Sequence, residues 1–150
     1  MNVYITGPHG MDSLPEPVIR RLDQIADKGY DIFVGDSKGF DAAVQKYYAM
    51  RKYRKVTVYV SGRHTRYNEG AFSETHIPAW PGETSAEFAR RKNVAMVEAA
   101  DCAFVVWDGY HRGVRQDIEE MLGYGKKVLL YWNGKMILVQ DVVELIRWAK

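Results

Sequence analysis

Five short runs of apolar, β-branched and aromatic residues alternate with stretches of helical spacing, and this alternation is the strongest constraint on the fold. The runs cover residues 3–6, 32–35, 56–60, 103–107 and 128–132. Each is almost continuously apolar, which is typical of strands buried on both faces of a sheet. Because parallel neighbours need helical crossovers, the pattern predicts an α/β protein, a Rossmann-like three-layer α/β/α sandwich with a mainly parallel sheet of about five strands.

Apolar stripes and capping signals mark the helices between these runs. The first two stripes are Val18, Ile19, Leu22, Ile25 and Ala26, and then Phe40, Ala43, Val44, Tyr47 and Met50. A capping box at Thr84 and Glu87 begins a third helix that continues to about Ala100. The fourth stripe is Val114, Ile118, Met121 and Leu122, and this helix stops at the glycines near residues 123–125.

The last 20 residues predict a hairpin strand and a terminal helix. An Asn133-Gly134 turn precedes a short strand over residues 135–139. Asp141 then caps a helix. The inner face of that helix carries Val142, Leu145, Ile146 and Ala149.

Composition narrows the class of protein. A chain of 150 residues that is 47% hydrophobic fits a single domain over residues 1–150. The formal charge of +2 is spread along the chain without a polycationic tail, so nucleic acid is not the expected partner. Cys102 is the only cysteine, which excludes an internal disulfide. With no membrane-span-length apolar run and no signal peptide, we expect a cytoplasmic protein without a membrane partner.

Residues 62–82 show no clear periodicity. Connections of this length are uncommon unless they form lids, binding loops or disordered segments. A mobile surface excursion and a ligand-covering loop are the two interpretations, and the sequence leaves both open.

Two loops that contain glycine and aspartate each follow a strand-like run and open a helical pattern. They are residues 35–41, Gly-Asp-Ser-Lys-Gly-Phe-Asp, and residues 107–113, Trp-Asp-Gly-Tyr-His-Arg-Gly. Such loops lie at the carboxyl edge of a parallel sheet, where helix N-termini expose N–H groups that attract phosphate. The pair therefore predicts a small-molecule ligand of the nucleotide type.

In the first loop, Gly35 and Gly39 permit backbone shapes that side chains forbid, and Lys38 can meet an anion as a point charge. Asp36 can accept a hydrogen bond from a ribose hydroxyl, and Asp41 falls in the first helical turn. Capping of the helix is the alternative role for both aspartates.

Two polar residues, Lys92 and Asn93, interrupt the apolar stripe of the third predicted helix. Polar groups at such positions need partners. Contact with a ligand is one interpretation, and a structural salt bridge or a lysine that reaches the sheet edge is the other.

Asp117 is the sharpest catalytic candidate, because its spacing from Val114 and Met121 places it at the border of the buried face of the fourth helix. A carboxylate there can act as a nucleophile or stabilise a developing oxocarbenium ion. Compensation of the helix dipole is the alternative. Asp108 is a second carboxylate that could hold the sugar, while His111 and Arg112 either bind phosphate or are solvated.

Five segments together resemble the SLOG superfamily of Rossmann-like nucleotide-binding proteins, most closely its YpsA-related branch. They are Ile5-Thr6-Gly7, residues 35–44, residues 66–70 (Arg-Tyr-Asn-Glu-Gly), Arg91-Lys92-Asn93 with Met96, and Trp107-Asp108-Gly109 with Arg112-Gly113. The resemblance covers nearly the whole chain and implies a nucleotide or nucleotide derivative at the strand carboxyl ends. The predicted ligand-binding residues are Gly7, Gly35, Asp36, Lys38, Gly39, Asp41, Arg66, Asn68, Lys92, Gly109, Arg112 and Gly113, with Asp108 beside them.

The chain is also distantly similar to LOG-type phosphoribohydrolases and to nucleoside deoxyribosyltransferases. Those enzymes carry a Gly-Thr pair, a catalytic Glu four residues beyond that Gly, and a Gly-Lys before the last strand. Gly113, Asp117, Gly125 and Lys126 keep this spacing, but Val114 replaces the Thr and Asp117 the Glu. The carboxylate would then lie about one methylene further from the sugar, which matters for attack geometry.

Three functions follow from these observations. The first is a nucleotide-binding hydrolase or transferase of an N-glycosidic bond, with Asp117 and Asp108 as its catalytic carboxylates. The replacements of Thr and Glu instead favour a non-catalytic sensor of a nucleotide-derived signal. Single-stranded nucleic-acid binding is the third. It would use Arg51, Lys52, Arg54, Lys55 and Arg63.

The sequence also carries expectations about metals and assembly. The four histidines and the single cysteine show no metal-ligand spacing, and we expect neither a metal nor a cofactor. Exposed aromatic surface at Tyr47, Tyr48 and Tyr53 would favour a homodimer.

Overall fold

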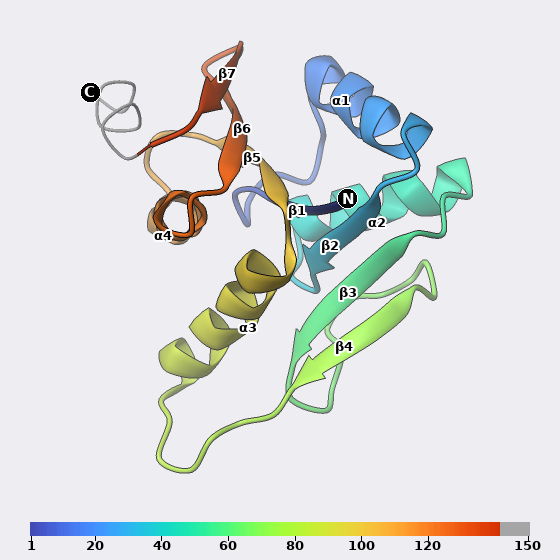
Figure 1. The fold of residues 1–150 in the computed structure, drawn as a ribbon. Coiled ribbons are helices and arrows are strands. Elements are labelled where there is room, and N and C mark those ends of the chain that lie inside the picture. The colour runs from blue at the N-terminus through green and yellow to red at the C-terminus, as the bar shows by residue number, and fades with distance from the viewer. Residues whose placement is uncertain (142–150) are drawn as a thin grey trace.

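The computed structural model describes residues 1–141, which form one sheet between two layers of helices (Figure 1). The strands are β1 (Asn2–Thr6), β2 (Asp31–Gly35), β3 (Val56–Ser61), β4 (Ser73–Ile77), β5 (Cys102–Trp107), β6 (Lys127–Trp132) and β7 (Lys135–Val139). The helices are α1 (Glu16–Asp27), α2 (Phe40–Arg51), α3 (Ser85–Ala99) and α4 (Arg112–Gly123). The Rossmann-like sandwich expected from the sequence is confirmed.

The sheet has the strand order β4-β3-β2-β1-β5-β6-β7, and every neighbouring pair is parallel except β6 and β7. The chain moves from β1 toward one edge through β2, β3 and β4, and then returns through α3 to place β5 on the other side of β1. The direction of the chain therefore reverses beside β1. In open α/β sheets, ligands bind at the carboxyl ends of strands next to such a reversal.

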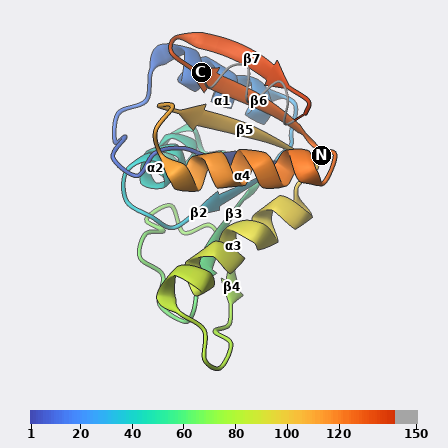
Figure 2. The same cartoon turned by 90° about the vertical axis from the view of Figure 1, so that its left-hand side faces the viewer.

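Helices α1 and α2 cover one face of the sheet, and α3 and α4 cover the other (Figures 1 and 2). Side chains alternate along each strand, so Val3 and Ile5 join the core on the first face while Tyr4 joins the core on the second. Burial on both faces explains why the strand sequences are nearly continuous apolar runs.

All five predicted strands and the hairpin strand are present, but the sheet has one further strand. Strand β4 lies within the 62–82 region and pairs in parallel with β3, from Thr57 opposite Ser73 to Ser61 opposite Ile77. It escaped prediction because it is an edge strand with only one aliphatic residue, Ile77. Residues 62–82 are therefore not one structureless excursion.

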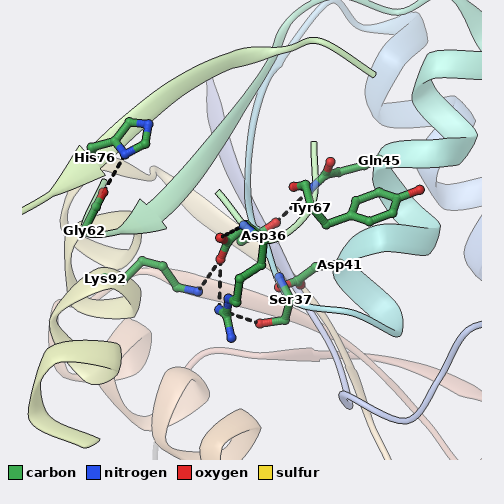
Figure 3. A network of polar contacts seen from close by, with 10 residues as sticks. Asp36, Ser37, Asp41, Gln45, Gly62, Tyr67, His76 and Lys92 are labelled. Atoms are coloured by element: carbon green, nitrogen blue, oxygen red, sulfur yellow. Dashed lines mark hydrogen bonds and ion pairs between the residues drawn. The ribbon is translucent and has the colours of Figure 1, made fainter. Parts of the chain in front are cut away.

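The connection from β3 to β4 is held by its own polar side chains. Asn68 accepts a hydrogen bond from the Phe72 backbone N–H and donates one to the Phe72 carbonyl, at 3.0 and 2.9 Å. The Phe72 ring is buried beneath the Arg54 guanidinium. At the far end of β4, a His76 ring nitrogen contacts the Gly62 carbonyl (Figure 3). These contacts give the connection a defined path beside β2 and α2.

The helix boundaries follow the capping signals, including the capping box of Thr84 and Glu87 at the start of α3. In α2 the predicted stripe needs correction. Tyr48 is fully buried and donates a hydrogen bond to the Leu22 carbonyl, whereas Met50 is 71% exposed. The buried face instead repeats every four residues from Phe40.

The predicted exposure of Tyr48 is also wrong, because this residue belongs to the core, while the homodimer stays a prediction. Tyr47 and Tyr53 are partly buried and donate hydrogen bonds to Asp23 and to the Tyr30 carbonyl. The predicted terminal helix, with Val142, Leu145, Ile146 and Ala149, lies outside the described residues.

Candidate functional site

A pocket of about 600 Å³ opens at the carboxyl edge of the sheet, where the strand order reverses. Its walls come from the ends of β1 and β2, from the inner face of α3 and from the start of α4. The residues proposed from the sequence that line it are Gly7, Gly35, Asp41, Arg66, Lys92, Asn93, His111, Gly113 and Asp117. The prediction of a site at the strand ends therefore agrees with the position of this pocket.

Asp36 lies just behind the pocket wall and pairs with two cations. Its carboxylate, 1% exposed, accepts hydrogen bonds from the Arg66 backbone N–H and guanidinium, both at 2.9 Å. The Lys92 ammonium lies 3.3 Å from Oδ1, the same oxygen that accepts from the Arg66 guanidinium (Figure 3). Burial alone would raise the pKa of Asp36, but these partners hold it below its usual value.

These contacts show a structural role for both Asp36 and Lys92, and contact with a ligand stays a prediction. Lys92 is 4% exposed and its interruption of the apolar stripe is explained by the salt bridge to Asp36. Asp36 does not cap α2, because the N-cap residue of that helix is Gly39 and no side chain caps it. Asp36 instead ties the end of β2 to the β3–β4 connection and to α3.

Asp41 projects from the first turn of α2 into the same pocket. One carboxylate oxygen lies 3.3 Å from the Ser37 backbone N–H. Burial raises the pKa of Asp41 to about 6, although Lys92 opposes that shift. Gly35 makes room for this carboxylate, because a Cβ on residue 35 would lie 2.6 Å from the Asp41 oxygen. Asp41 can thus exchange a proton near neutral pH.

Asp117 lies in the opposite wall and is 2% exposed. Its Oδ2 accepts hydrogen bonds from the Tyr4 hydroxyl at 2.9 Å and from Thr6 at 3.4 Å. Its Oδ1 pairs with Arg90 of α3 at 2.6 Å. Burial raises the pKa of Asp117 even though Arg90 opposes that shift. Specific side-chain partners from β1 and α3, rather than the helix dipole alone, therefore surround this carboxylate.

Two histidines meet at the same pocket. His9 from the β1–α1 loop and His111 at the N-cap of α4 have ring centroids 4.9 Å apart. The Val114 backbone N–H donates a hydrogen bond to His111 Nδ1 at 3.3 Å, which caps the helix. Partial burial lowers the pKa of His9, and so do the nearby charges of His111, Lys92 and Arg66.

The loop after β5 is organised differently from the loop after β2. Asp108 is exposed and accepts hydrogen bonds from the backbone N–H groups of Tyr110 and His111, at 2.8 and 2.7 Å. Those local bonds hold the pKa of Asp108 below its usual value against the opposing effect of partial burial. Asp108 thus shapes its own loop.

Several other predicted ligand residues also lie outside the pocket lining. They are Asp36, Lys38, Gly39, Asn68, Asp108, Gly109 and Arg112. Lys38 and Arg112 are exposed side chains of the two loops, and Asn68 fastens the β3–β4 connection. Gly39 has φ +83° and touches the first loop so closely that a Cβ would lie 1.7 Å from the His9 carbonyl oxygen. Gly39 therefore positions His9 rather than lining the pocket.

Sequence reasoning did not assign functional roles to Tyr4, Arg90 and Gln45. Tyr4 sits inside an apolar strand run, where an aromatic residue gives no sign of a polar role. Arg90 lies three residues before Asn93, so helical spacing could have placed it beside the same stripe. Gln45 is fully buried and donates hydrogen bonds to the Gly35 and Tyr67 carbonyls, which joins β2 to the β3–β4 connection.

Three of the five basic residues that suggested single-stranded nucleic-acid binding have partners, whereas Lys52 and Arg63 are exposed. Arg51 pairs with Asp23 and Asp27. Arg54 donates hydrogen bonds to the Gly70 and Ala71 carbonyls, and Lys55 to the Gly29 carbonyl. At these three positions the segment is therefore tied to the fold rather than presented as an open basic track.

Within residues 1–141, no group of three His, Cys, Asp or Glu side chains is arranged to hold a metal ion. The helices of that part of the chain are also too short or too polar to cross a membrane. Comparisons of the chain with protein-family models and with curated protein sequences found no match.

Proposed function

We propose that the chain binds a nucleotide or nucleotide derivative in the pocket at the carboxyl edge of the sheet. The observation that carries this proposal is a pocket at the strand carboxyl ends that brings together a buried carboxylate paired with Arg90 and two cations paired with Asp36. The buried Asp117 carboxylate lies in one wall, and the Arg66 and Lys92 cations lie near the other. The volume of about 600 Å³ falls within the range of roughly 300–1,000 Å³ for small-molecule sites.

The Asp117 wall suits the ribose. Its carboxylate is fixed by Tyr4, Thr6 and Arg90, so its negative charge is held in place before a ligand arrives. A preorganised carboxylate in a partly dry site stabilises positive charge that develops on a sugar ring. This wall therefore supports chemistry at the anomeric carbon.

The opposite wall suits an anionic group. Arg66 and Lys92 share the single carboxylate of Asp36, and the second carboxylate near Lys92, Asp41, has a pKa of about 6. Below that pKa the group of four side chains carries a net positive charge. A phosphate can therefore be accommodated without a large repulsive cost.

In the proposed reaction, the bond between C1′ and the base nitrogen breaks and its electron pair leaves with the base. Asp117 stabilises the oxocarbenium character at C1′, and water adds to that carbon and releases a proton. The leaving base takes up a proton, for which Asp41, with a pKa of about 6, is the candidate donor. Asp108 has no part in this proposal because it is engaged in its own loop.

A non-catalytic nucleotide sensor is the second candidate, and one observation favours it. Both oxygens of Asp117 already accept hydrogen bonds or ion pairs, so nucleophilic attack by Asp117 would require the loss of a contact to Tyr4, Thr6 or Arg90. Binding without turnover needs no such loss.

The test combines thermal shift with chromatography of free bases, using ribo- and deoxyribonucleosides and their 5′-phosphates. An enzyme would release base, and Asp117→Asn would lower that release by at least roughly 100-fold, as loss of a key electrostatic group does. Glu119→Gln is the matched control, because Glu119 is exposed on the same helix. Stabilisation without base release would favour the sensor, and the absence of any binding would contradict both candidates.

A further inference from the structure

His9 and His111 meet at the pocket, and the chemistry proposed at C1′ does not use them. Building on the proposed function, we propose that His9 and His111, with Arg66 and Lys92, form a proton-linked subsite for a phosphomonoester dianion. Binding of that dianion would draw a proton onto the subsite, so the pocket would prefer a nucleoside monophosphate to a nucleoside or a cyclic phosphodiester.

The geometry brings four nitrogen-bearing side chains to one pocket from four separate segments. His9 comes from the loop after β1, Arg66 from the β3–β4 connection, Lys92 from α3 and His111 from the start of α4. The two imidazole rings are 4.9 Å apart between centroids and tilted by 56°. An anion seated among them would meet donors from several directions, as phosphate sites require.

The backbone of α4 fixes which nitrogen of His111 can donate. Because the Val114 N–H donates to Nδ1, the proton of the neutral ring lies on Nε2. His111 therefore offers an N–H donor without being charged. The positive end of the α4 dipole lies at the same place and also favours an anion.

The charges that surround His9 explain why binding of the dianion should be accompanied by protonation of its ring. The groups facing it are His111 from α4, Lys92 from α3 and Arg66 from the β3–β4 connection, and with partial burial they lower its pKa. Its ring is consequently neutral at neutral pH in the free protein. A dianion beside it would offset the positive charges of Lys92 and Arg66 and favour the protonated ring.

Asp41 is the second group in the pocket that can take up a proton. Its pKa of about 6 reflects burial, opposed by Lys92 and raised further by Asp117 and Asp36. A phosphate nearby would raise this pKa again. The two groups act in the same direction, so variants are needed to separate their shares.

The charge of the ligand then sets specificity. A phosphomonoester has a second pKa near roughly 6 and carries nearly two charges at pH 7.5. A cyclic phosphodiester carries one charge and a nucleoside none. Because only the monoester provides a second charge to offset the cationic surroundings of His9, it gains most from proton uptake.

The experiment is isothermal titration calorimetry of the full chain at pH 7.5 in two buffers of different ionisation enthalpy. The probes are the four ribonucleoside 5′-monophosphates, the matching nucleosides and the 3′,5′-cyclic monophosphates. We expect net proton uptake with a monophosphate, and affinity at least roughly tenfold higher than for its nucleoside or cyclic form. Equal affinities with no proton uptake would overturn the subsite while leaving the proposed function intact. Binding of none of these probes would overturn both.

Variants identify the residue that takes up the proton. His9→Asn should remove most of the uptake and bring the affinity for the monophosphate to within about threefold of that for the nucleoside. Asp41→Asn should remove a smaller share. His64→Asn is the matched control, because His64 is an exposed histidine that does not line the pocket. Unchanged uptake in His9→Asn, with its fold verified by circular dichroism, would overturn the role of His9.

Discussion

The loops after β2 and β5 look alike in sequence and do opposite things in the structure. Each places an aspartate directly after a buried strand and a glycine close behind it. In the first loop, Asp36 turns inward and pairs with Arg66 and Lys92. In the second, Asp108 stays exposed and accepts hydrogen bonds from two N–H groups of its own loop.

The difference arises from partners far away in the sequence. Arg66 and Lys92 lie 30 and 56 residues beyond Asp36, whereas the partners of Asp108 lie two and three residues beyond it. A local Gly-Asp pattern does not indicate which cations from distant parts of the chain will lie beside the aspartate. The same motif can therefore tie distant segments together, as Asp36 does, or order its own loop, as Asp108 does.

Removal of one charge in each loop should give the largest contrast. Asp36→Asn leaves Lys92 buried beside a neutral amide, so we expect the free energy of unfolding to fall by about 3 kcal/mol. Asp108→Asn weakens only local bonds and should cost about 1 kcal/mol or less. Urea denaturation of the two variants measures both values.

A double variant checks that the cost in the first loop comes from the unpaired cation. Lys92→Met added to Asp36→Asn should recover part of the lost stability, because the buried charge is gone. Equal losses for Asp36→Asn and Asp108→Asn would show that the two loops are not different in the way described.

The pH dependence of stability should be specific to the first loop. Folding raises the pKa of Asp41 from 3.8 to about 6, so the folded protein holds more protons between about pH 4 and pH 6. Its free energy of unfolding should therefore fall as the pH rises through that window. Asp41→Asn removes this loss and should be more stable than the wild type at pH 8, by up to about 3 kcal/mol.

Urea denaturation from pH 4 to pH 8 measures this difference between the variant and the wild type. The gain in Asp41→Asn should shrink toward pH 4. A gain that is constant across the range would mean that ionisation of Asp41 carries no cost. Asp108→Asn is the control: the wild-type Asp108 carboxyl has a lowered pKa, so its removal should give no such gain.

The glycines of the two loops should separate binding from stability. A Cβ on Gly35 would push against Asp41 and lie 3.3 Å from the Lys92 ammonium, so Gly35→Ala should weaken nucleotide affinity by roughly tenfold. Gly109 has φ +86°, so Gly109→Ala should cost about 1 kcal/mol of stability with a smaller effect on affinity. Calorimetry measures the nucleotide affinity of both variants, and urea denaturation measures their stability. A larger loss of affinity in Gly109→Ala, together with a larger loss of stability in Gly35→Ala, would contradict this division.

The smallest effects should come from the exposed cations of the two loops. Lys38→Gln and Arg112→Gln remove charges outside the pocket lining and should change nucleotide affinity by less than about threefold, through long-range screening alone. Arg66→Gln, which removes a lining cation, should have a larger effect in the same assay. A loss with Lys38→Gln equal to that with Arg66→Gln would place Lys38 at the ligand.

Much of the fold could be predicted because strands buried on both faces have nearly continuous apolar sequences. The capping box of Thr84 and Glu87 likewise marks the start of a helix from local sequence alone. Strand β4 could not be predicted, since an edge strand buries little and needs little apolar sequence. Position in the site was predictable for Asp117 and Lys92 from helical spacing. The partnership of Tyr4 and Arg90 with Asp117 was not, because it depends on how β1 and α3 pack.

The central claim is that a nucleotide-type ligand binds between Asp117 and the Arg66–Lys92 pair, and backbone NMR during titration with ribonucleoside 5′-monophosphates tests it most directly. We expect chemical-shift changes to concentrate at Gly7, Gly35, Ser37, Lys92 and Gly113, which line the pocket, and to be small at Gly29 and Lys55, which lie at the opposite edge of the sheet. Changes confined to residues away from the pocket, or no changes with any of the four monophosphates, would contradict the claim.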